Sequence, residues 1–331
     1  MVEKVWRRQQ QGNTNTENKR FSHLKTIFRY PGAKGRYLNQ ILPFMHPATP
    51  KYHDVFVGGG SVMLAYACAN PSSAISVNDL DSGIFAFWQI LMEPDATIKK
   101  LFALIDQQPT VEQFVRLKHS TPETLVEKAY RIIFLNRCAF SGIVTSGPMG
   151  GYNQTGESKI DCRYNAEQIK YRILSIRKLL KDRLTVHNLH VADYLQTVCS
   201  NEVAYLDPPY YEKGRDLYPV HMQPNEHLQL SNILQNMNNW VLSYDAHAEI
   251  KRLYQGFSVI SHLKTKYSIA NASGKAPVAL EYIITPKVEY KMNCISLVDI
   301  VLLPFYIIKY TAIGIWLGGK AARKALHAVF K

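Results

Sequence analysis

The feature that most constrains the fold is a repeated alternation of short apolar strands with helical segments. Residues 53–57 are β-branched and aromatic, end at three glycines (58–60), and are followed by a helical pattern that begins at Ser61. Further strand candidates lie at 74–77, 184–191, 203–206, 240–243, 257–261 and 281–285, most of them separated by helical patterns. Strands that alternate with helices pair in a largely parallel sheet. The sequence therefore predicts an α/β fold.

One region interrupts this alternation. Two helical stretches, 111–119 and 123–136, lead into a segment from 141 to 158 that is rich in Gly, Ser and Asn. A loop of this length inside a compact domain is usually functional or disordered. We therefore expect an inserted subdomain at 95–172 within a main domain formed by 27–94 and 173–286.

The basic charge is concentrated at the two ends of the chain. The net charge is +13, and residues 1–26 hold six Lys/Arg against two acids while residues 286–331 hold seven against two. Basic extensions bind many anionic surfaces, so the overall charge does not by itself identify a nucleic-acid partner. Local chemistry has to carry that identification.

The cysteines and the N-terminus indicate a reducing compartment. The five cysteines lie far apart, with no CxxC pair and no nearby His at metal-ligand spacing, which predicts free thiols and no metal site. Residues 1–25 are polar and lack the apolar core of a secretory signal. We expect a flexible arm over 1–26 and a cytoplasmic location.

The strongest chemical signal is Asp207-Pro208-Pro209-Tyr210, which directly follows the strand candidate 203–206. Adjacent prolines fix φ and donate no N–H, so the turn is stiff and its carbonyls remain able to accept. A carboxylate and a carbonyl that accept the two N–H bonds of adenine N6 would direct its lone pair at a methyl donor. Tyr210 can stack on a base taken out of a duplex, for which its hydroxyl is not needed. The alternative is a Pro-Pro turn with an incidental Asp.

A second signal is the glycine turn where the first strand meets its helix. Glycines such as Gly58 and Gly60, after Phe56, let the backbone approach a ligand closely, and Asp79 could accept from ribose hydroxyls. Similar turns also occur in folds that bind no ligand. The absence of a GxxxxGK[ST] pattern argues against a phosphate-cradling NTPase.

These motifs occur together and in order, and in this respect the chain resembles the Dam-type (α-class, D12) DNA adenine N6-methyltransferases over about 28–286. The shared pattern covers 29–35, 56–60, 78–79, 134–137, 193–194, 207–210 and 264–274. Two departures stand out. Tyr30-Pro31 replaces an aromatic followed by a small residue, and Cys138 begins a less polar stretch than the family has there.

The resemblance implies a Rossmann-like methyltransferase sheet of seven strands, mostly parallel with the last antiparallel, and a mainly helical target-recognition subdomain in the insertion. It also implies S-adenosylmethionine as cofactor and methylation of adenine N6 in a short double-stranded DNA site by base flipping. Tyr30 and Lys34 would contact the methionine end of the cofactor, Asp79 its ribose, and the Asp193 region its adenine. The implied cofactor-binding residues are Tyr30, Gly32, Lys34, Phe56, Gly58, Gly60, Asp79, Asp193 and Asp207.

Arg137, Arg163 and Tyr164 are the candidate DNA contacts, because Arg reads guanine edges and aromatic rings wedge or stack. An exposed, solvated face is the alternative for each of them. The runner-up enzyme is a cytosine N4-methyltransferase, which runs similar amine chemistry. An inactive DNA-binding module with a vestigial fold is the non-enzymatic alternative, and the presence of Lys34, Asp79 and Asp207 argues against it.

The C-terminal extension, 287–331, does not fit the family pattern. From 295 to 317, 17 of 23 residues are apolar, which is near the length of a membrane span. Lys309 and Asp299 oppose insertion, and Pro304 allows two short interfacial helices instead. We expect this segment either to contact a membrane surface or to pack on the protein or a partner.

Overall fold

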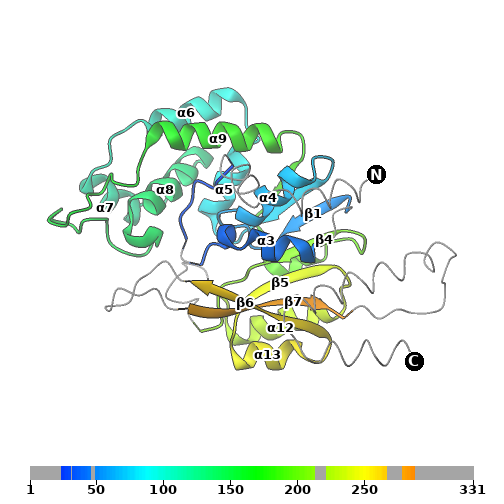
Figure 1. Cartoon of the computed structure of the whole chain (residues 1–331). Helices are drawn as coiled ribbons and strands as arrows, with labels where there is room; N and C mark the ends of the chain where they lie inside the picture. The colour runs from blue at the N-terminus through cyan, green and yellow to red at the C-terminus, as the bar shows by residue number, and fades with distance from the viewer. Residues whose placement is uncertain (1–23, 31, 46–48, 213–220, 267–277, 288–331) are drawn as a thin grey trace, which may run out of the picture. The chain divides into compact units, whose positions relative to one another are not determined.

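The computed structural model describes residues 24–30, 32–45, 49–212, 221–266 and 278–287, all of which belong to one compact unit, 1–287. In this part of the chain, a seven-stranded sheet has the order β3-β2-β1-β4-β5-β7-β6. Figure 1 labels β1, β4, β5, β7 and β6 of this sheet. The strands are β1 (Lys51–Asp54), β2 (Ala74–Asn78), β3 (Leu184–His187), β4 (Val203–Leu206), β5 (Trp240–Asp245), β6 (Ser258–Lys266) and β7 (Val278–Pro286). Each overlaps one of the segments predicted from the sequence.

The strand directions confirm the predicted fold class. β1 pairs in parallel with β2 and β4, and the parallel pairing continues from β2 to β3 and from β4 to β5. β7 runs antiparallel between β5 and β6. The fold is therefore a Rossmann-like α/β sheet, mostly parallel, whose last strand in the chain is antiparallel.

Helices cover both faces of this sheet. The longer ones are α4 (Ser61–Ala69), α5 (Ser82–Ile90), α6 (Asp95–Ile105), α7 (Val111–His119), α8 (Leu125–Cys138), α9 (Ala166–Leu180), α12 (Pro224–Gln235) and α13 (Ala248–Tyr254). Short elements are η1 (Lys34–Arg36), α3 (Leu38–Ile41), η2 (Leu42–Phe44), η3 (Phe140–Gly142) and α10 (Val191–Leu195). The predicted helix 111–119 coincides with α7, whereas the predicted helix 123–136 lies two residues further along, as α8.

The core consists of two clusters that correspond to the two sheet faces. Val203 and Tyr205 of β4 pack in a cluster with α4, α5, α8 and α9. Ala204 and Leu206 pack in another cluster with α10, α12 and α13. Because successive side chains of a strand point to opposite faces, β4 is buried on both sides. This double burial holds the carboxyl end of β4 in place.

The segment that interrupts the alternation is mainly helical. Its helices α6 and α7 each contact α8, and the three lie together with α9 in Figure 1. Ile98, Phe114 and Ile133 from this segment belong to the same core cluster as Tyr52 of β1. The insertion therefore shares a core with the sheet, and the subdomain boundaries at 95 and 172 remain a prediction.

Several predictions fall on segments that the structure does not describe. These are the arm up to residue 23, most of the late loop 264–274, and the extension 288–331 with its apolar stretch 295–317. Within the described ranges, none of the helices combines the length and the apolar character needed to cross a membrane.

Candidate active site

The candidate site lies at the carboxyl ends of β1 and β4, where the strand order reverses. β2 and β3 extend the sheet on one side of β1, and β5 extends it on the far side of β4. In open α/β sheets, such a reversal leaves a crevice in which ligands bind. A pocket opens there, and it is lined by eight of the nine residues predicted to bind the cofactor: Tyr30, Gly32, Lys34, Phe56, Gly58, Gly60, Asp79 and Asp207.

Asp193 is the ninth predicted residue, and the structure does not bring it to the pocket. It lies exposed in the first turn of α10. Leu189 and His190, which precede that helix, and Val191, its first residue, line the pocket instead. This region therefore reaches the pocket through the start of the helix rather than through the Asp193 carboxylate.

The glycine turn after β1 is held by backbone hydrogen bonds of Gly58, and Gly60 has no room for a side chain. The Gly58 N–H donates to Asp79 Oδ2 at 2.8 Å, and the Gly58 carbonyl accepts from Trp88 Nε1 at 3.0 Å. Gly60 has φ +67°, and a Cβ there would lie 2.5 Å from the Trp88 ring. A side chain at this position would be strained and would collide with Trp88.

Asp79 is the predicted ribose acceptor, and its ionisation is strongly perturbed. Burial raises its pKa to about 7, with a further contribution from Asp81, whereas N–H groups of Asp81 and Gly58 act in the opposite direction. The carboxyl group therefore titrates near neutral pH. A ligand that donates hydrogen bonds would favour its ionised form.

Asp54 is a pocket residue that the sequence reasoning missed. It ends β1, is 2% exposed, and accepts from the Tyr52 hydroxyl through Oδ2 at 3.3 Å. Among the described residues, its Oδ1 has no hydrogen-bond partner. Burial, followed by the charges of Asp207 and Asp79, raises its pKa well above the usual value. Its position as an acid inside the apolar run 53–57 was the sequence signal that could have identified it as a candidate site residue.

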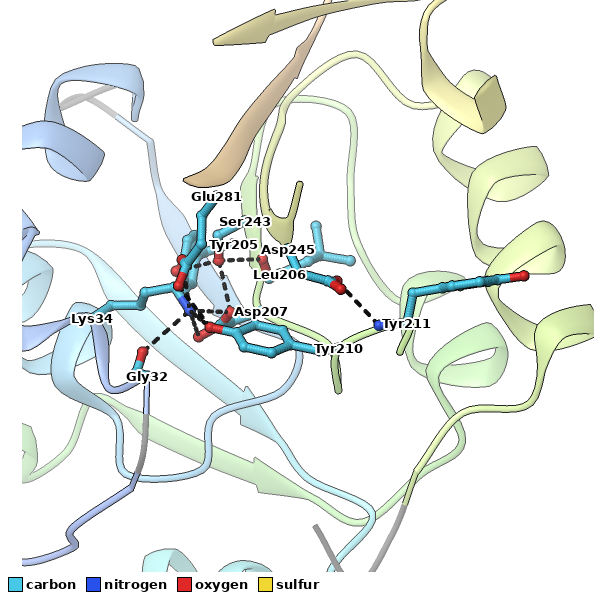
Figure 2. A network of polar contacts seen from close by, with 10 residues as sticks. All are labelled: Gly32, Lys34, Tyr205, Leu206, Asp207, Tyr210, Tyr211, Ser243, Asp245 and Glu281. Carbon is cyan, nitrogen blue, oxygen red and sulfur yellow. Dashed lines mark hydrogen bonds and ion pairs between the residues drawn. The ribbon is translucent and has the colours of Figure 1, made fainter. Parts of the chain in front are cut away.

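Asp207 follows β4 directly, and its carboxylate is held from two sides (Figure 2). Lys34 Nζ donates to Oδ1 at 2.7 Å and to Oδ2 at 3.0 Å. The hydroxyl of Ser243, on the neighbouring strand β5, donates to Oδ1 at 2.8 Å. The side chain of Asp207 keeps 25% of its surface exposed, so this oriented carboxylate still faces the pocket.

Lys34 is a buried cation between two carboxylates. Its Nζ also lies 3.4 Å from Glu281 Oε2, and its side chain is only 3% exposed. Burial alone would lower the pKa of Lys34, but Asp207, Tyr210 and Glu281 outweigh it and hold the pKa well above the usual value. The ammonium therefore stays charged at neutral pH.

Tyr210 is anchored within the same network. It is 3% exposed, and its hydroxyl donates to Glu281 Oε1 at 2.7 Å. Gly32, with φ +79°, makes room for it, since a Cβ there would lie 2.8 Å from the Tyr210 hydroxyl. Of the two prolines, Pro208 is buried and Pro209 lines the pocket. Sequence reasoning had placed Glu281 only at a strand start, without a role.

The three predicted DNA contacts differ in exposure. Arg163 is exposed, whereas Arg137 is 8% exposed and donates from Nη1 to the Ile27 carbonyl at 3.2 Å. Burial and the neighbouring arginines lower the pKa of Arg137 to about 10. The Tyr164 hydroxyl donates to the Ile105 carbonyl at 3.0 Å. Arg137 and Tyr164 thus have internal partners, and Arg163 is the one of the three that faces solvent.

The described residues contain no group of three or more His, Cys, Asp or Glu side chains arranged to hold a metal ion. Cys68, Cys138, Cys162 and Cys199, the cysteines that the structure describes, form no disulfide with one another.

Comparisons with known proteins identify the family of the chain. The family model of the D12 class N6 adenine-specific DNA methyltransferases matches residues 30–269. The type II methyltransferase M.MjaIII of Methanocaldococcus jannaschii is 22% identical over 206 residues, which is 56% of this chain and 69% of that protein. The type II methyltransferase M.CviBI of Paramecium bursaria Chlorella virus NC1A is 22% identical over 257 residues, 76% of this chain and 94% of that protein.

Among solved structures, the chain is similar to a precorrin-6y C5,15-methyltransferase from Geobacter metallireducens GS-15. The TM-score is 0.34 and the sequence identity 6%, and the match covers 75% of this chain and 85% of that one.

Proposed function

Because the chain belongs to the D12 class N6 adenine-specific DNA methyltransferase family, it is a DNA methyltransferase, and we propose that it methylates adenine N6 with S-adenosylmethionine as donor. The observation that carries this proposal is that Asp207 lines the same pocket as Asp54 and Asp79. One carboxylate can face a target amine while the other two face a methyl donor.

The pocket residues fit S-adenosylmethionine, which when bound would supply a methyl group activated by a sulfonium. The unpaired Oδ1 of Asp54 suits a cationic ammonium, because a buried acceptor without a partner is costly until a donor reaches it. Asp79 suits ribose hydroxyls, and Lys34 also lines the pocket, with its ammonium already paired with Asp207 and Glu281. The turn around Gly58 allows close approach of the backbone.

Asp207 has the acceptor capacity that the target amine needs. Each carboxylate oxygen can accept about two hydrogen bonds. Oδ1 already accepts from Lys34 and Ser243, whereas Oδ2 accepts from Lys34. We infer that Oδ2 accepts an N–H of the target amine and a carbonyl of the Pro-Pro turn accepts the other. The carboxylate then stabilises the positive charge that develops on the nitrogen as the methyl group arrives.

The pocket also sets requirements for the DNA. A base inside a duplex cannot reach a carboxylate in a pocket, so the target adenine has to be flipped out of the helix. Tyr210, three residues after Asp207 in the chain, is the aromatic ring proposed for such a base, and because it is 3% exposed, stacking requires the loop to expose it. Arg163, exposed in the insertion, is our candidate for a contact with the surrounding duplex.

Sequencing of DNA from a methylation-free host that expresses the full chain tests this proposal. We expect N6-methyladenine at one short sequence, and N4-methylcytosine in its place would establish the runner-up enzyme. A parallel calorimetric titration with S-adenosylmethionine measures cofactor binding and distinguishes the two enzymes from an inactive module. Unmodified DNA together with no cofactor binding would identify an inactive DNA-binding module and refute the enzymatic proposal.

A further inference from the structure

Glu281 is a buried carboxylate that the mechanism above does not use. It lies in β7, is 1% exposed, and accepts a 2.7 Å hydrogen bond from the Tyr210 hydroxyl. Its Oε2 lies 3.4 Å from Lys34 Nζ. It also falls outside residues 30–269, the part of the chain that matches the family model. Burial of a carboxylate costs free energy unless neighbouring groups pair with it. We therefore asked what Glu281 does for the groups that it contacts.

We propose that Glu281 is a positioning residue for methyl transfer, which holds the Tyr210 ring and the Lys34 ammonium in place around Asp207. The inference rests on the proposed function of the same site. In this proposal, a residue of the antiparallel strand β7 positions the catalytic loop that follows β4.

The first argument is geometric. Asp245 of β5 is the cross-strand partner of Glu281, and its Oδ1 accepts from the Tyr211 N–H at 3.1 Å. Two paired strand positions therefore hold two successive tyrosines of the loop, Tyr210 through its hydroxyl and Tyr211 through its backbone. Figure 2 shows the Tyr210 ring directed into the network and the Tyr211 ring directed away from it. This arrangement fixes the orientation of the loop at two points.

The second argument is electrostatic. If Lys34 faced Asp207 alone, the pair would be neutral, and its cation would oppose the positive charge that develops on the target nitrogen. Glu281 beside Lys34 gives the three groups a net negative charge. At short distances in a partly desolvated site, this difference is larger than in water. Glu281 thus allows Lys34 to orient Asp207 without cancelling its charge.

The third argument concerns which residues stabilise the ionised form of Glu281. Burial raises the pKa of Glu281, while Lys34 and the Tyr210 hydroxyl act in the opposite direction and Asp207 adds to the rise. Each of the contacts that favour the ionised Glu281 therefore comes from a residue of the catalytic site. A carboxylate needed only for the stability of β7 would not require these partners.

Glu281→Gln is the direct test, because it keeps the size of the side chain and removes its charge. We expect the single-turnover rate of methyl transfer from labelled S-adenosylmethionine to unmethylated genomic DNA to fall about ten- to hundredfold, as for loss of a hydrogen bond to a charged group. Cofactor affinity and the KM for DNA should change little. Glu249→Gln, the same change at a partly exposed position on α13 that pairs with Arg252 and does not line the pocket, is the matched control and should retain the normal rate.

Tyr210→Phe provides the second arm, since it removes the hydroxyl and leaves every charge in place. If the two residues act through one contact, this variant also slows transfer about ten- to hundredfold, and the double variant is no slower than the worse single one. Circular dichroism checks that each variant is folded. Should Glu281→Gln not fold, Tyr210→Phe decides by itself.

Three results would overturn the proposal. A normal kcat in a folded Glu281→Gln protein, or in Tyr210→Phe, would show that the contact does not position the loop. A faster rate would show that it restrains the loop in a resting form. Fully additive losses would show that the two residues act separately. Absence of transfer by the wild-type chain would refute the proposed function instead, and the positioning role with it.

Discussion

The catalytic half and the cofactor half of the pocket differ in how well their polar groups are satisfied. Around Asp207, the ammonium of Lys34 and the hydroxyl of Ser243 already occupy defined acceptor positions. Around the glycine turn, Asp54 Oδ1 has no partner among the described residues, and the pKa of Asp79 is raised to about 7. The Asp207 carboxylate is thus oriented by neighbouring side chains, and the buried Glu281 Oε2 beside it, which has no hydrogen bond, still has the Lys34 ammonium 3.4 Å away. Asp54 Oδ1 has no hydrogen bond and no ion pair among the described residues.

This difference indicates that the two halves of the pocket contribute to different properties, the catalytic half to the rate of transfer and the cofactor half to cofactor affinity. Pre-oriented groups around a reacting atom lower the barrier because they need no reorganisation during the reaction. A buried acceptor without a partner costs about 1–3 kcal/mol, and a ligand that donates to it recovers that energy on binding. Changes in the catalytic half should therefore act on the rate, and changes in the cofactor half on affinity.

The largest effect is expected for Asp207→Asn. The amide keeps the size but replaces one acceptor oxygen with a donor, so transfer should slow by orders of magnitude, as for loss of a transition-state contact worth a few kcal/mol. Single-turnover rates and calorimetric cofactor titrations measure the two effects separately. If cofactor affinity falls by as large a factor as the transfer rate, the catalytic half and the cofactor half do not contribute separately to rate and affinity.

Lys34→Met should lower the stability of the protein. It leaves Asp207 and Glu281 without their shared cation, and breaking a buried ion pair from one side costs about 3–5 kcal/mol. Denaturant unfolding monitored by circular dichroism measures this loss. Lys170→Met, which breaks surface ion pairs with Asp106 and Glu167, is the control and should have a small effect.

The loss in Lys34→Met should also depend on pH. Burial already raises the pKa of Glu281, and removal of the Lys34 cation takes away a contact that opposes this rise, so Glu281 binds a proton more tightly in the folded protein than in the unfolded chain. The stability that it contributes is present at low pH and lost as the pH rises above the ordinary Glu range, so the defect should grow with rising pH. A defect that is independent of pH would mean that lost packing, and not unpaired charge, causes it.

Asp79→Asn should have a smaller effect, confined to the cofactor half. Wild-type affinity for S-adenosylmethionine should increase as the pH rises through about 7, because the ionised carboxyl accepts better from ribose hydroxyls. The variant should bind about tenfold more weakly and lose this dependence. Calorimetric titrations over a pH series test both points. A pH dependence that persists in Asp79→Asn would assign it to another group.

The same residue predicts how the stability of the ligand-free protein depends on pH. The folded pKa of Asp79 lies above its ordinary value, so its contribution is present at low pH and is lost as the pH rises through about 7. Thermal unfolding of wild type and Asp79→Asn should therefore differ in slope between about pH 4 and 7. Parallel curves would contradict the raised pKa.

The smallest effect is expected for a chain that ends at Lys287. Every residue of both halves precedes this point, and the described residues up to Lys287 belong to one compact unit. Methyl transfer and cofactor affinity should both match those of the full chain in the assays above. A truncated protein that folds and binds cofactor but transfers no methyl group would show that the extension takes part in catalysis.

The sequence by itself determined the α/β alternation, the glycine turn and the loop that begins at Asp207. These depend on short-range backbone chemistry, such as the fixed φ of proline and the positive φ of Gly60, which neighbouring residues encode. Local patterns were less accurate at element ends. The predicted strand 184–191 stops at His187, because His190 caps a new helix, α10.

Only the tertiary structure decided which distant residues complete the site. Glu281 reaches Tyr210 because β7 inserts between β5 and β6 in a register that pairs Glu281 with Asp245. Ser243 reaches Asp207 because β5 lies beside β4, and Arg137 turns inward to the Ile27 carbonyl. Strand order and register result from burial of the whole sheet between its helices, so no local pattern around these residues specifies their partners.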